Sequence, residues 1–508
     1  MSSIKKLAGQ TMWYGVSSIA ARFLFYLLTP YLTYKLSVTG YGDMSIMYAA
    51  IPFLNVIFTY GIETAYFRFA SKDEYKNDIY STATISVLCS TLLLTTVLIL
   101  SRSSLAHLLR LDNHREFITY SALIIAFDTL STLPLAKLRL AQRSRKYAMI
   151  MISKILMQIG IIYFLLSVCP KLALENPSGF IATFYDPGYG VGYIIIANLC
   201  AAFFALVLLR SEFFSFEFKF NSKVWFTMLA YSLPLLIAGF GGMINETFDR
   251  IMLTWLAPVS GINAAKDEVA IYSACYKLSI LISLFIQAFR MGAEPFFFKQ
   301  SEGLNPQKTY ARVMKFFVIT ITIMFLVVAM YIDIWKYFLS TDSAKLKIYW
   351  TGLKVVPILL LANMFLGIYY NLSIWYKLTH KTISGAYITL IGAAITLLIN
   401  FIFIPYFGYM ACAWATFFCY GSMMVISYLW GQKAYPIPYA WKKLIAYIVI
   451  VVLLYFIHSV IVYFFKGNIF SLVTATILLA GYLWFILRVE AKEFSRMPVI
   501  GKYFKATT

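Results

Sequence analysis

Apolar residues dominate this chain in runs of about twenty, and short polar segments separate one run from the next. A helix needs about 20 apolar residues to cross the hydrocarbon core of a bilayer. The pattern therefore predicts fourteen membrane-spanning helices and no sizeable domain outside the membrane. Their approximate ranges are 11–34, 44–67, 79–100, 117–136, 147–169, 188–209, 224–247, 269–291, 313–334, 351–373, 382–404, 409–430, 444–465 and 469–487.

Four of these expected helices carry polar or small residues at steps of three and four, which places them on one face. A polar face on a spanning helix must point at protein or water. We therefore expect the four helices to surround a hydrated cavity, although such residues also serve as packing contacts between helices. The stripes are Thr11, Gly15, Ser18, Arg22, Tyr26, Thr29 and Thr33 in the first helix; Tyr48, Pro52, Asn55, Thr59, Glu63 and Tyr66 in the second; Thr227, Ala230, Pro234, Ala238, Gly241 and Asn245 in the seventh; and Tyr276, Ser279, Ser283, Gln287, Arg290 and Glu294 in the eighth.

Weak internal sequence repeats suggest how the helices are grouped. Shifting the sequence by 228 residues lays the second expected span on the eighth, and a shift of 212 lays the first on the seventh. Both pairs are six spans apart and run in the same direction, as in transporters with parallel repeats. We therefore expect two parallel six-helix lobes around a central cavity, 1–210 and 211–433, followed by a terminal helix pair and tail, 434–508.

Composition agrees with an all-α polytopic membrane protein. Of the 508 residues 61% are hydrophobic and only 13% are charged, which excludes a water-soluble globular protein of this length. The six cysteines show neither CxxC pairs nor metal-ligand spacing, so we expect no disulfide, metal site or other cofactor. The first apolar run continues to about Tyr34, too long for a cleaved signal peptide, so it is expected to remain as a span.

The formal net charge of +21 is explained by membrane topology, because the basic residues are scattered between the apolar runs. Assigning alternate connections to opposite sides puts 28 of the 43 Lys and Arg residues on the side of both termini and 12 on the other. The side richer in basic residues should be cytoplasmic. We expect both termini inside and no binding of nucleic acid; the cluster "KLRLAQRSRK", residues 137–146, is interpreted as a topology determinant.

Charges inside the expected spans are the candidate functional groups. A guanidinium at the midplane of an isolated helix costs at least about 3 kcal/mol, so Arg22 requires compensation. One hypothesis is that Arg22, Lys154 and Lys277 receive an anionic ligand, held mainly by the N-terminal half. The other is that Asp128 forms a packing ion pair with Arg22 or Lys154. The predicted ligand-binding residues are Arg22, Tyr26, Asn55, Lys154, Lys277 and Gln287.

A second set of charges is predicted to couple an ion or to act as gates. Asp128 would balance the empty cavity or carry a proton, and Arg290 and Glu294 are four apart, the spacing of a helical ion pair. At the outer end of the seventh span, a salt-bridged helix end and an outer gate remain open alternatives. The residues concerned there are Glu246, Asp249 and Arg250.

Glu63 belongs to the stretch "YGIETAYFRF", residues 60–69, at the inner end of the second expected span. Arg68 lies five residues further on, which is a poor distance for a partner on the same helix. A partner across the cavity mouth, or a proton, suits Glu63 better. An inner gate and a helix-packing salt bridge are both consistent with this position.

Three segments resemble a known family: "YGIETAYFRF", "DRIML" at 249–253, and "VAIYSACYKLS" running into "AFRMGAEPFFF" through 269–298. They are similar to the polysaccharide transporter family, the O-antigen and exopolysaccharide flippase branch of the multidrug/oligosaccharidyl-lipid/polysaccharide exporter superfamily. The resemblance extends over the whole chain in span number, inside termini and two-lobe layout.

The resemblance implies a protein of the bacterial inner membrane that moves undecaprenyl-pyrophosphate-linked oligosaccharides to the periplasmic leaflet. It implies alternating access of two lobes, a cationic cavity for the pyrophosphate, and coupling to H⁺ or Na⁺. Expected partners are the lipid-linked oligosaccharide, membrane lipids and polysaccharide polymerase or assembly proteins. Alternatives are a peptidoglycan-precursor flippase, a drug exporter, which the excess of cations disfavours, and a membrane polymerase or ligase, for which the short outer loops leave little room. We expect no enzymatic activity.

Overall fold

The computed structural model describes residues 19–70, 78–301, 305–379, 381–465 and 467–495. Within these ranges the chain forms helices and no strand. Thirteen helices in the described part are long and apolar enough to span a membrane, and they coincide with the second to fourteenth expected spans. The predicted all-α, polytopic fold is confirmed. The first expected span is described only from residue 19 onward, where residues 19–27 are helical, so Thr11, Gly15 and Ser18 lie outside the described residues.

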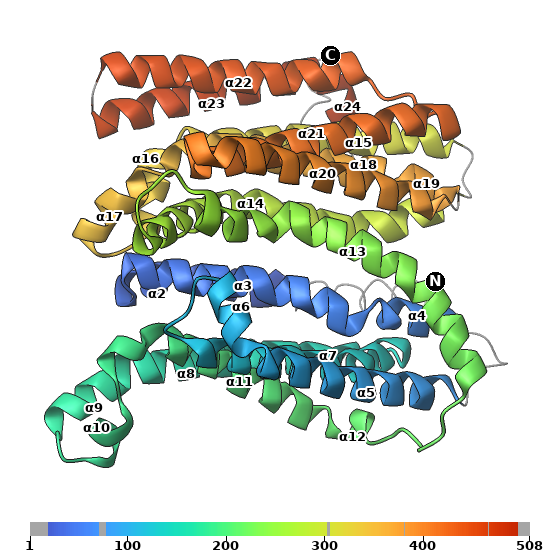
Figure 1. Ribbon diagram of the computed structural model, residues 1–508. Coiled ribbons are helices and arrows are strands. Elements are labelled where there is room, and N and C mark those ends of the chain that lie inside the picture. The colour runs from blue at the N-terminus through green and yellow to red at the C-terminus, as the bar shows by residue number, and fades with distance from the viewer. Residues whose placement is uncertain (1–18, 71–77, 302–304, 380, 466, 496–508) are drawn as a thin grey trace.

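The first lobe occupies the lower half of Figure 1, where α5, α7, α8 and α11 pack side by side. Its helices are α2 (Thr29–Lys35), α3 (Val38–Thr59), α4 (Ile62–Phe69), α5 (Ile79–Leu100), α6 (Arg102–Leu108), α7 (Arg115–Leu140), α8 (Ser144–Tyr163), α9 (Cys169–Glu175), α10 (Phe180–Phe184), α11 (Gly190–Leu208) and α12 (Arg210–Phe213). A π-helical turn, Phe164–Val168, joins α8 to α9. Helix α3 lies innermost, against the second lobe.

The second lobe lies above the first in Figure 1, with α18, α20 and α21 packed closely together. Its helices are α13 (Ser222–Leu256), α14 (Ile262–Gln300), α15 (Pro306–Ala329), α16 (Ile332–Trp335), α17 (Ser343–Trp350), α18 (Val356–Leu372), α19 (Ile374–Leu378), α20 (Thr382–Phe407) and α21 (Tyr409–Ala434). Helix α14 packs against α3 of the first lobe, so these two helices form the seam between the lobes.

The last two long helices, α22 (Trp441–Phe464) and α23 (Asn468–Val489), form a pair on the outside of α15. Glu490 fixes this pair, because its buried carboxylate (1% exposed) lies 2.9 Å from Lys315 Nζ of α15 and 2.6 Å from Lys443 Nζ of α22. Burial by itself raises the pKa of Glu490, but hydrogen bonds from Lys443, Tyr447 and Lys315 outweigh it and lower the pKa. The pair is thus held by ionic contacts as well as apolar ones.

The second expected span is broken where we predicted a continuous helix. Tyr60 and Gly61 both have left-handed backbone conformations, with φ of 33° and 74°, so α3 ends at Thr59 and α4 begins at Ile62. A Cβ at Gly61 would lie 3.1 Å from the carbonyl oxygen of Ser232 in α13. Glycine therefore permits both the turn and the close approach of α13. The prediction that one polar stripe runs unbroken from Tyr48 to Tyr66 is wrong.

Helix α13 is 35 residues long and contacts both lobes. Near its start, Trp225 Nε1 donates to Ser86 Oγ of α5 in the first lobe at 2.8 Å. Nearer its end, Asn245 Nδ2 donates to the Thr389 carbonyl of α20 in the second lobe at 3.2 Å. Figure 1 shows α13 running obliquely between the two layers. Pro234 lies inside it, between the two sets of contacts.

The lobes are joined at the end that the charge count assigns to the outer face. Asp43 of α3 and Lys266 of α14 form an ion pair of 2.8 Å, and both side chains are largely buried. Beside it, Thr39 Oγ1 donates to the Asp267 carboxylate at 2.8 Å. Lys345 of α17 donates to the carbonyl oxygens that end α2, including that of Leu36 at 2.7 Å. These contacts hold the two lobes together at this end.

Candidate functional site

Three adjoining cavities lie between the lobes and inside the second lobe. Their volumes are about 810, 260 and 430 Å³, and Glu246 and Tyr276 line all three. We name them the chamber, the outer compartment and the middle compartment, in that order. The chamber and the middle compartment each fall in the range of about 300–1,000 Å³ that is typical of small-molecule sites. The three compartments therefore offer room for a ligand much larger than an ion.

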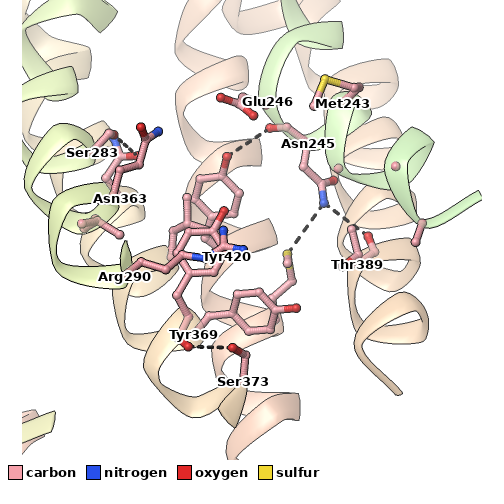
Figure 2. Close-up of a pocket in the computed structure, with 18 of the residues that line it drawn as sticks. Met243, Asn245, Glu246, Ser283, Arg290, Asn363, Tyr369, Ser373, Thr389 and Tyr420 are labelled. Atoms are coloured by element: carbon pink, nitrogen blue, oxygen red, sulfur yellow. Dashed lines mark hydrogen bonds between the residues drawn. The ribbon is translucent and has the colours of Figure 1, made fainter. Parts of the chain in front are cut away.

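The chamber belongs mainly to the second lobe. Its walls come from α13, α14, α18, α19, α20 and α21, and Arg22 is its only lining residue from the first lobe among those described. Figure 2 shows Ser283 and Asn363 on one side of the chamber and Asn245 and Thr389 on the other, with Tyr420 between them. Along α14 the lining runs from Tyr276 to Glu294, which corresponds to about 27 Å at 1.5 Å per residue.

The middle compartment is lined by the three predicted cations, which come from three different helices. Arg22, Lys154 and Lys277 all line it, together with the amides of Gln158 and Asn198. Neither Arg22 nor Lys277 forms an ion pair with any described residue. Because Arg22 also lines the chamber, the unpaired positive charge lies where the two compartments meet. Arg22 comes from the first lobe and Lys277 from the second, so the charge belongs to the seam and not mainly to the N-terminal half.

Lys154 and Asp128 form an ion pair that joins α8 to α7. Both side chains keep some exposure, 22% and 29%. Of the two hypotheses for Asp128, this geometry favours a packing ion pair, with Lys154 and not Arg22 as the partner. The charge of Lys154 is thereby largely neutralised, which leaves Arg22 and Lys277 as the cations available to a ligand.

Asp128→Asn is expected to lower the free energy of unfolding by about 3 kcal/mol, because it leaves the Lys154 ammonium partly buried without its partner. Thermal unfolding of the purified protein in detergent measures this loss. The double variant Asp128→Asn/Lys154→Met should recover most of the stability. A stable Asp128→Asn protein that has lost only ion-driven transport would contradict the packing role.

Glu246 is a cavity carboxylate without an ion pair among the described residues. It lies on α13, exposed to all three compartments. Glu294 also lines the chamber, but it is paired with Arg290 at 2.8 Å and with Lys377 of α19 at 2.5 Å. The predicted Arg290–Glu294 pair is therefore present, with a second cation that the sequence did not indicate. Glu246 is left as the carboxylate free to exchange a proton or to bind a cation.

Asp249 and Arg250 lie deep in the protein and not at a helix end. Helix α13 continues to Leu256, and Asp249 is only 3% exposed. Its carboxylate pairs with Arg250 at 2.9 Å and accepts a hydrogen bond from the Tyr272 hydroxyl at 2.7 Å. The Arg250 guanidinium lies 4.5 Å from the ring centre of Tyr276. The expected salt bridge exists, but it lies within α13 and not at the end of the helix, because the helix extends beyond the apolar run.

Glu63 forms an ion pair with Arg139 of α7, within the first lobe. The pair joins α4 to α7, and neither residue lines any of the three cavities, so the geometry favours helix packing over an inner gate. Arg139 belongs to the basic cluster that we interpreted as a topology determinant alone. That interpretation missed the partner, because the turn at Gly61 redirects α4 towards α7.

The remaining predicted ligand-binding residues differ in position. Tyr26 lines the middle compartment and stacks on Phe338, with ring centres 4.6 Å apart, and Gln287 lines both the middle compartment and the chamber. Asn55 is not among the lining residues of the three compartments. At its level α13 crosses α3 so closely that a Cβ on Gly239 would lie 2.9 Å from the Val56 side chain. This crossing covers the polar face of α3.

Sequence reasoning missed most of the chamber wall. Tyr369, Tyr370, Tyr376, Lys377 and Tyr420 line it, together with Asn363. A signal was present, since Asn363, Tyr370 and Lys377 are spaced by seven residues, two helical turns. These residues come from α18, α19 and α21, which are not among the four helices with polar stripes that the sequence pattern marked.

Known structures share this fold. The lipid II flippase MurJ, in an inward closed conformation, superposes with a TM-score of 0.66 over 94% of this chain and 98% of that one, at 12% identity. An outward-facing multidrug resistance MATE family transporter of the MOP superfamily gives a TM-score of 0.56 over 84% of this chain and 94% of that one, at 12% identity. The class is therefore a polytopic membrane protein with the fold of MurJ and the MATE transporters.

The sequence comparisons narrow this class. The family described as "Polysaccharide biosynthesis protein" matches residues 7–301, and the chain belongs to that family. A curated relative, the Lsg locus protein 1 of Haemophilus influenzae, is 21% identical over 308 residues, which are 60% of this chain and 68% of that protein.

Proposed function

We propose that this protein is a flippase that moves lipid-linked oligosaccharides, joined to undecaprenyl through a pyrophosphate, across the bacterial inner membrane. It carries out no covalent chemistry on its substrate. Coupling to an H⁺ or Na⁺ gradient drives alternating access of the two lobes, and Glu246 is the carboxylate that senses the ion.

The observation that carries the proposal is the unpaired positive charge at the junction of two cavities. Arg22 and Lys277 have no ionic partner among the described residues, and an unpaired cation within a membrane-spanning segment is costly. A pyrophosphate supplies the missing anion, and an arginine binds phosphate oxygens in a bidentate manner. The family, polysaccharide biosynthesis, supports a glycan as the group attached to it.

Two other transport functions fit less well. A cationic drug would meet two unpaired cations and one unpaired carboxylate among the described lining residues. A peptidoglycan precursor also contains a pyrophosphate, and the fold is that of a lipid II flippase. Family membership favours a polysaccharide repeat unit over this second candidate.

The proposal is tested by depleting the protein and determining on which side of the membrane the substrate collects. Loss of a flippase traps the lipid-linked repeat unit on the cytoplasmic leaflet, whereas loss of a polymerase or ligase leaves single repeat units in the periplasm. Labelling intact cells with a reagent that cannot cross the membrane distinguishes the two. Depletion that leaves every glycan in place but causes lysis would instead indicate the peptidoglycan precursor.

The contacts at the outer end are those that alternating access has to break. Asp43 and Lys266, Thr39 and Asp267, and the end of α2 with Lys345 all join the lobes there. The chamber meanwhile extends along α14 to Glu294, towards the inner end. The arrangement therefore corresponds to a state closed on the outer side, and export requires the seam between α3 and α14 to separate.

Gly42→Ala is expected to hold this seam open. A Cβ at Gly42 would lie 2.2 Å from the Lys266 carbonyl oxygen, a distance that no methyl group tolerates while α3 contacts α14. Export should fall, and Cys275, fully buried in α14 beside Tyr349, whose ring contacts Tyr41 of α3, should react with a thiol reagent added from outside. Mass spectrometry of the labelled peptide measures the reaction.

Gly160→Ala is the matched control for the seam, because no atom lies within 4 Å of the methyl position there. This variant should transport normally and keep Cys275 protected. Unchanged protection of Cys275 in a fully active Gly42→Ala protein would show that the seam does not close during transport.

A further inference from the structure

The chamber and the middle compartment differ in chemistry, although Arg22 lines both. The chamber is lined by five tyrosines and three carboxamides, with hydroxyl groups between them. Its tyrosines are Tyr276, Tyr369, Tyr370, Tyr376 and Tyr420, and its carboxamides are Asn245, Gln287 and Asn363. Aromatic faces next to hydrogen-bonding groups suit a ligand with both apolar faces and hydroxyl edges, which is the chemistry of a sugar ring.

Three of the charged side chains that line the chamber, Arg290, Glu294 and Lys377, are already paired with one another. Arg290 and Lys377 both bind Glu294, at 2.8 and 2.5 Å, and the Arg290 guanidinium also lies 4.7 Å from the ring centre of Tyr370. In the middle compartment, by contrast, Arg22 and Lys277 have no such partner among the described residues. An anion therefore gains most beside Arg22 and Lys277, and the rest of the chamber suits an uncharged polar group.

Some polar groups of the chamber are fixed and others are available. Asn245 donates to the Thr389 carbonyl at 3.2 Å, and Asn363 accepts from Ser283 at 3.0 Å, so these amides are held in place. Gln287 and the Tyr370 hydroxyl have no hydrogen bond with any described residue, although both line the chamber. A rigid wall with a few free donors and acceptors is the usual form of a specific binding site.

We infer that the chamber is the sugar subsite, which holds the oligosaccharide by its tyrosine faces while the pyrophosphate lies at Arg22 and Lys277. The inference rests on the proposed function and adds where each part of the substrate binds. The first sugar is covalently attached to the pyrophosphate, and Arg22 stands at the boundary between the two cavities. The second lobe thus selects the glycan, and the seam recognises the part common to all such lipids.

Binding of two probes to the purified full-length protein tests this assignment. One probe is a short-chain polyprenyl pyrophosphate, and the other is the same lipid carrying an oligosaccharide. The double variant Tyr370→Leu/Tyr376→Leu removes two aromatic rings and is expected to weaken binding of the glycosylated probe about tenfold. Binding of the bare probe should not change, which also shows that the variant is folded.

Two further variants separate the roles of the rings and of the compartments. Tyr370→Phe/Tyr376→Phe keeps both rings and should retain most of the affinity for the glycosylated probe. Tyr48→Leu removes a tyrosine from the middle and outer compartments and should leave the difference between the probes unchanged.

The outcomes that overturn the inference are distinct from those that overturn the function. If the leucine double variant binds the glycosylated probe as tightly as the unmodified protein, or if Tyr48→Leu abolishes the advantage of that probe, the sugars do not occupy the chamber. Failure of the bare probe to bind the unmodified protein would overturn the proposed function itself, and the sugar subsite with it.

Discussion

Arg22→Ala is expected to reduce glycan export about 100-fold or more while the protein still inserts and folds. Removing one charged partner from a buried, hydrogen-bonded contact costs roughly 2–5 kcal/mol. Arg22 lines both the chamber and the middle compartment. No other unpaired cation among the described residues lines both cavities. Export of labelled repeat units in cells that express equal amounts of each variant measures the effect.

The variants of Arg22 also test how the pyrophosphate is held. Arg22→Lys keeps the charge but loses the planar fork that binds two oxygens, so it should restore only part of the export. Arg102→Ala, an exposed arginine of α6, is the matched control and should export normally. Normal export by Arg22→Ala would remove the main support for a pyrophosphate at this site.

Glu246→Gln is expected to abolish the response to an ion gradient while substrate still binds. Glu246 faces all three compartments, and Glu294 and Asp128 are held in ion pairs. Coupling between an ion and a transported ligand amounts to about 5- to 150-fold in affinity. In proteoliposomes, gradient-driven transport by Glu246→Gln should therefore fall to the rate measured without a gradient.

The same experiment identifies the coupling ion, because H⁺ and Na⁺ gradients are imposed separately on the unmodified protein. Glu217→Gln serves as the control, since its carboxylate is 69% exposed and pairs only with the exposed Lys219 among the described residues. A Glu246→Gln protein that still responds to the gradient would show that the ion binds elsewhere.

The spans, their order and the all-α class could be predicted because each depends only on consecutive residues. A run of twenty apolar residues is stable in a bilayer whatever the other runs do. The Arg290–Glu294 pair could be predicted equally well, since a spacing of four residues on one helix brings the two side chains together. The interruption at Gly61 could not, because it depends on how closely α13 approaches.

Partners between helices were predicted less well. Asp128 was placed opposite Arg22 or Lys154, and only the packing of α7 against α8 selects Lys154. Asn55 shares a helical face with Tyr48, yet α13 crosses α3 near Asn55, whereas Tyr48 lines the middle compartment. Periodicity gives the face of a residue, whereas the crossing of another helix decides whether that face meets water.

The sequence by itself thus determined that this protein is a bundle of membrane helices with polar faces and a few costly cations within the spans. Those properties follow from local hydropathy and helical spacing, which need no information about neighbours. Only the tertiary structure decided which cations remain unpaired, and that a chamber of about 810 Å³ lies among the tyrosines of the second lobe. Ion pairs and cavities form between residues distant in sequence, so their energies depend on how the lobes pack.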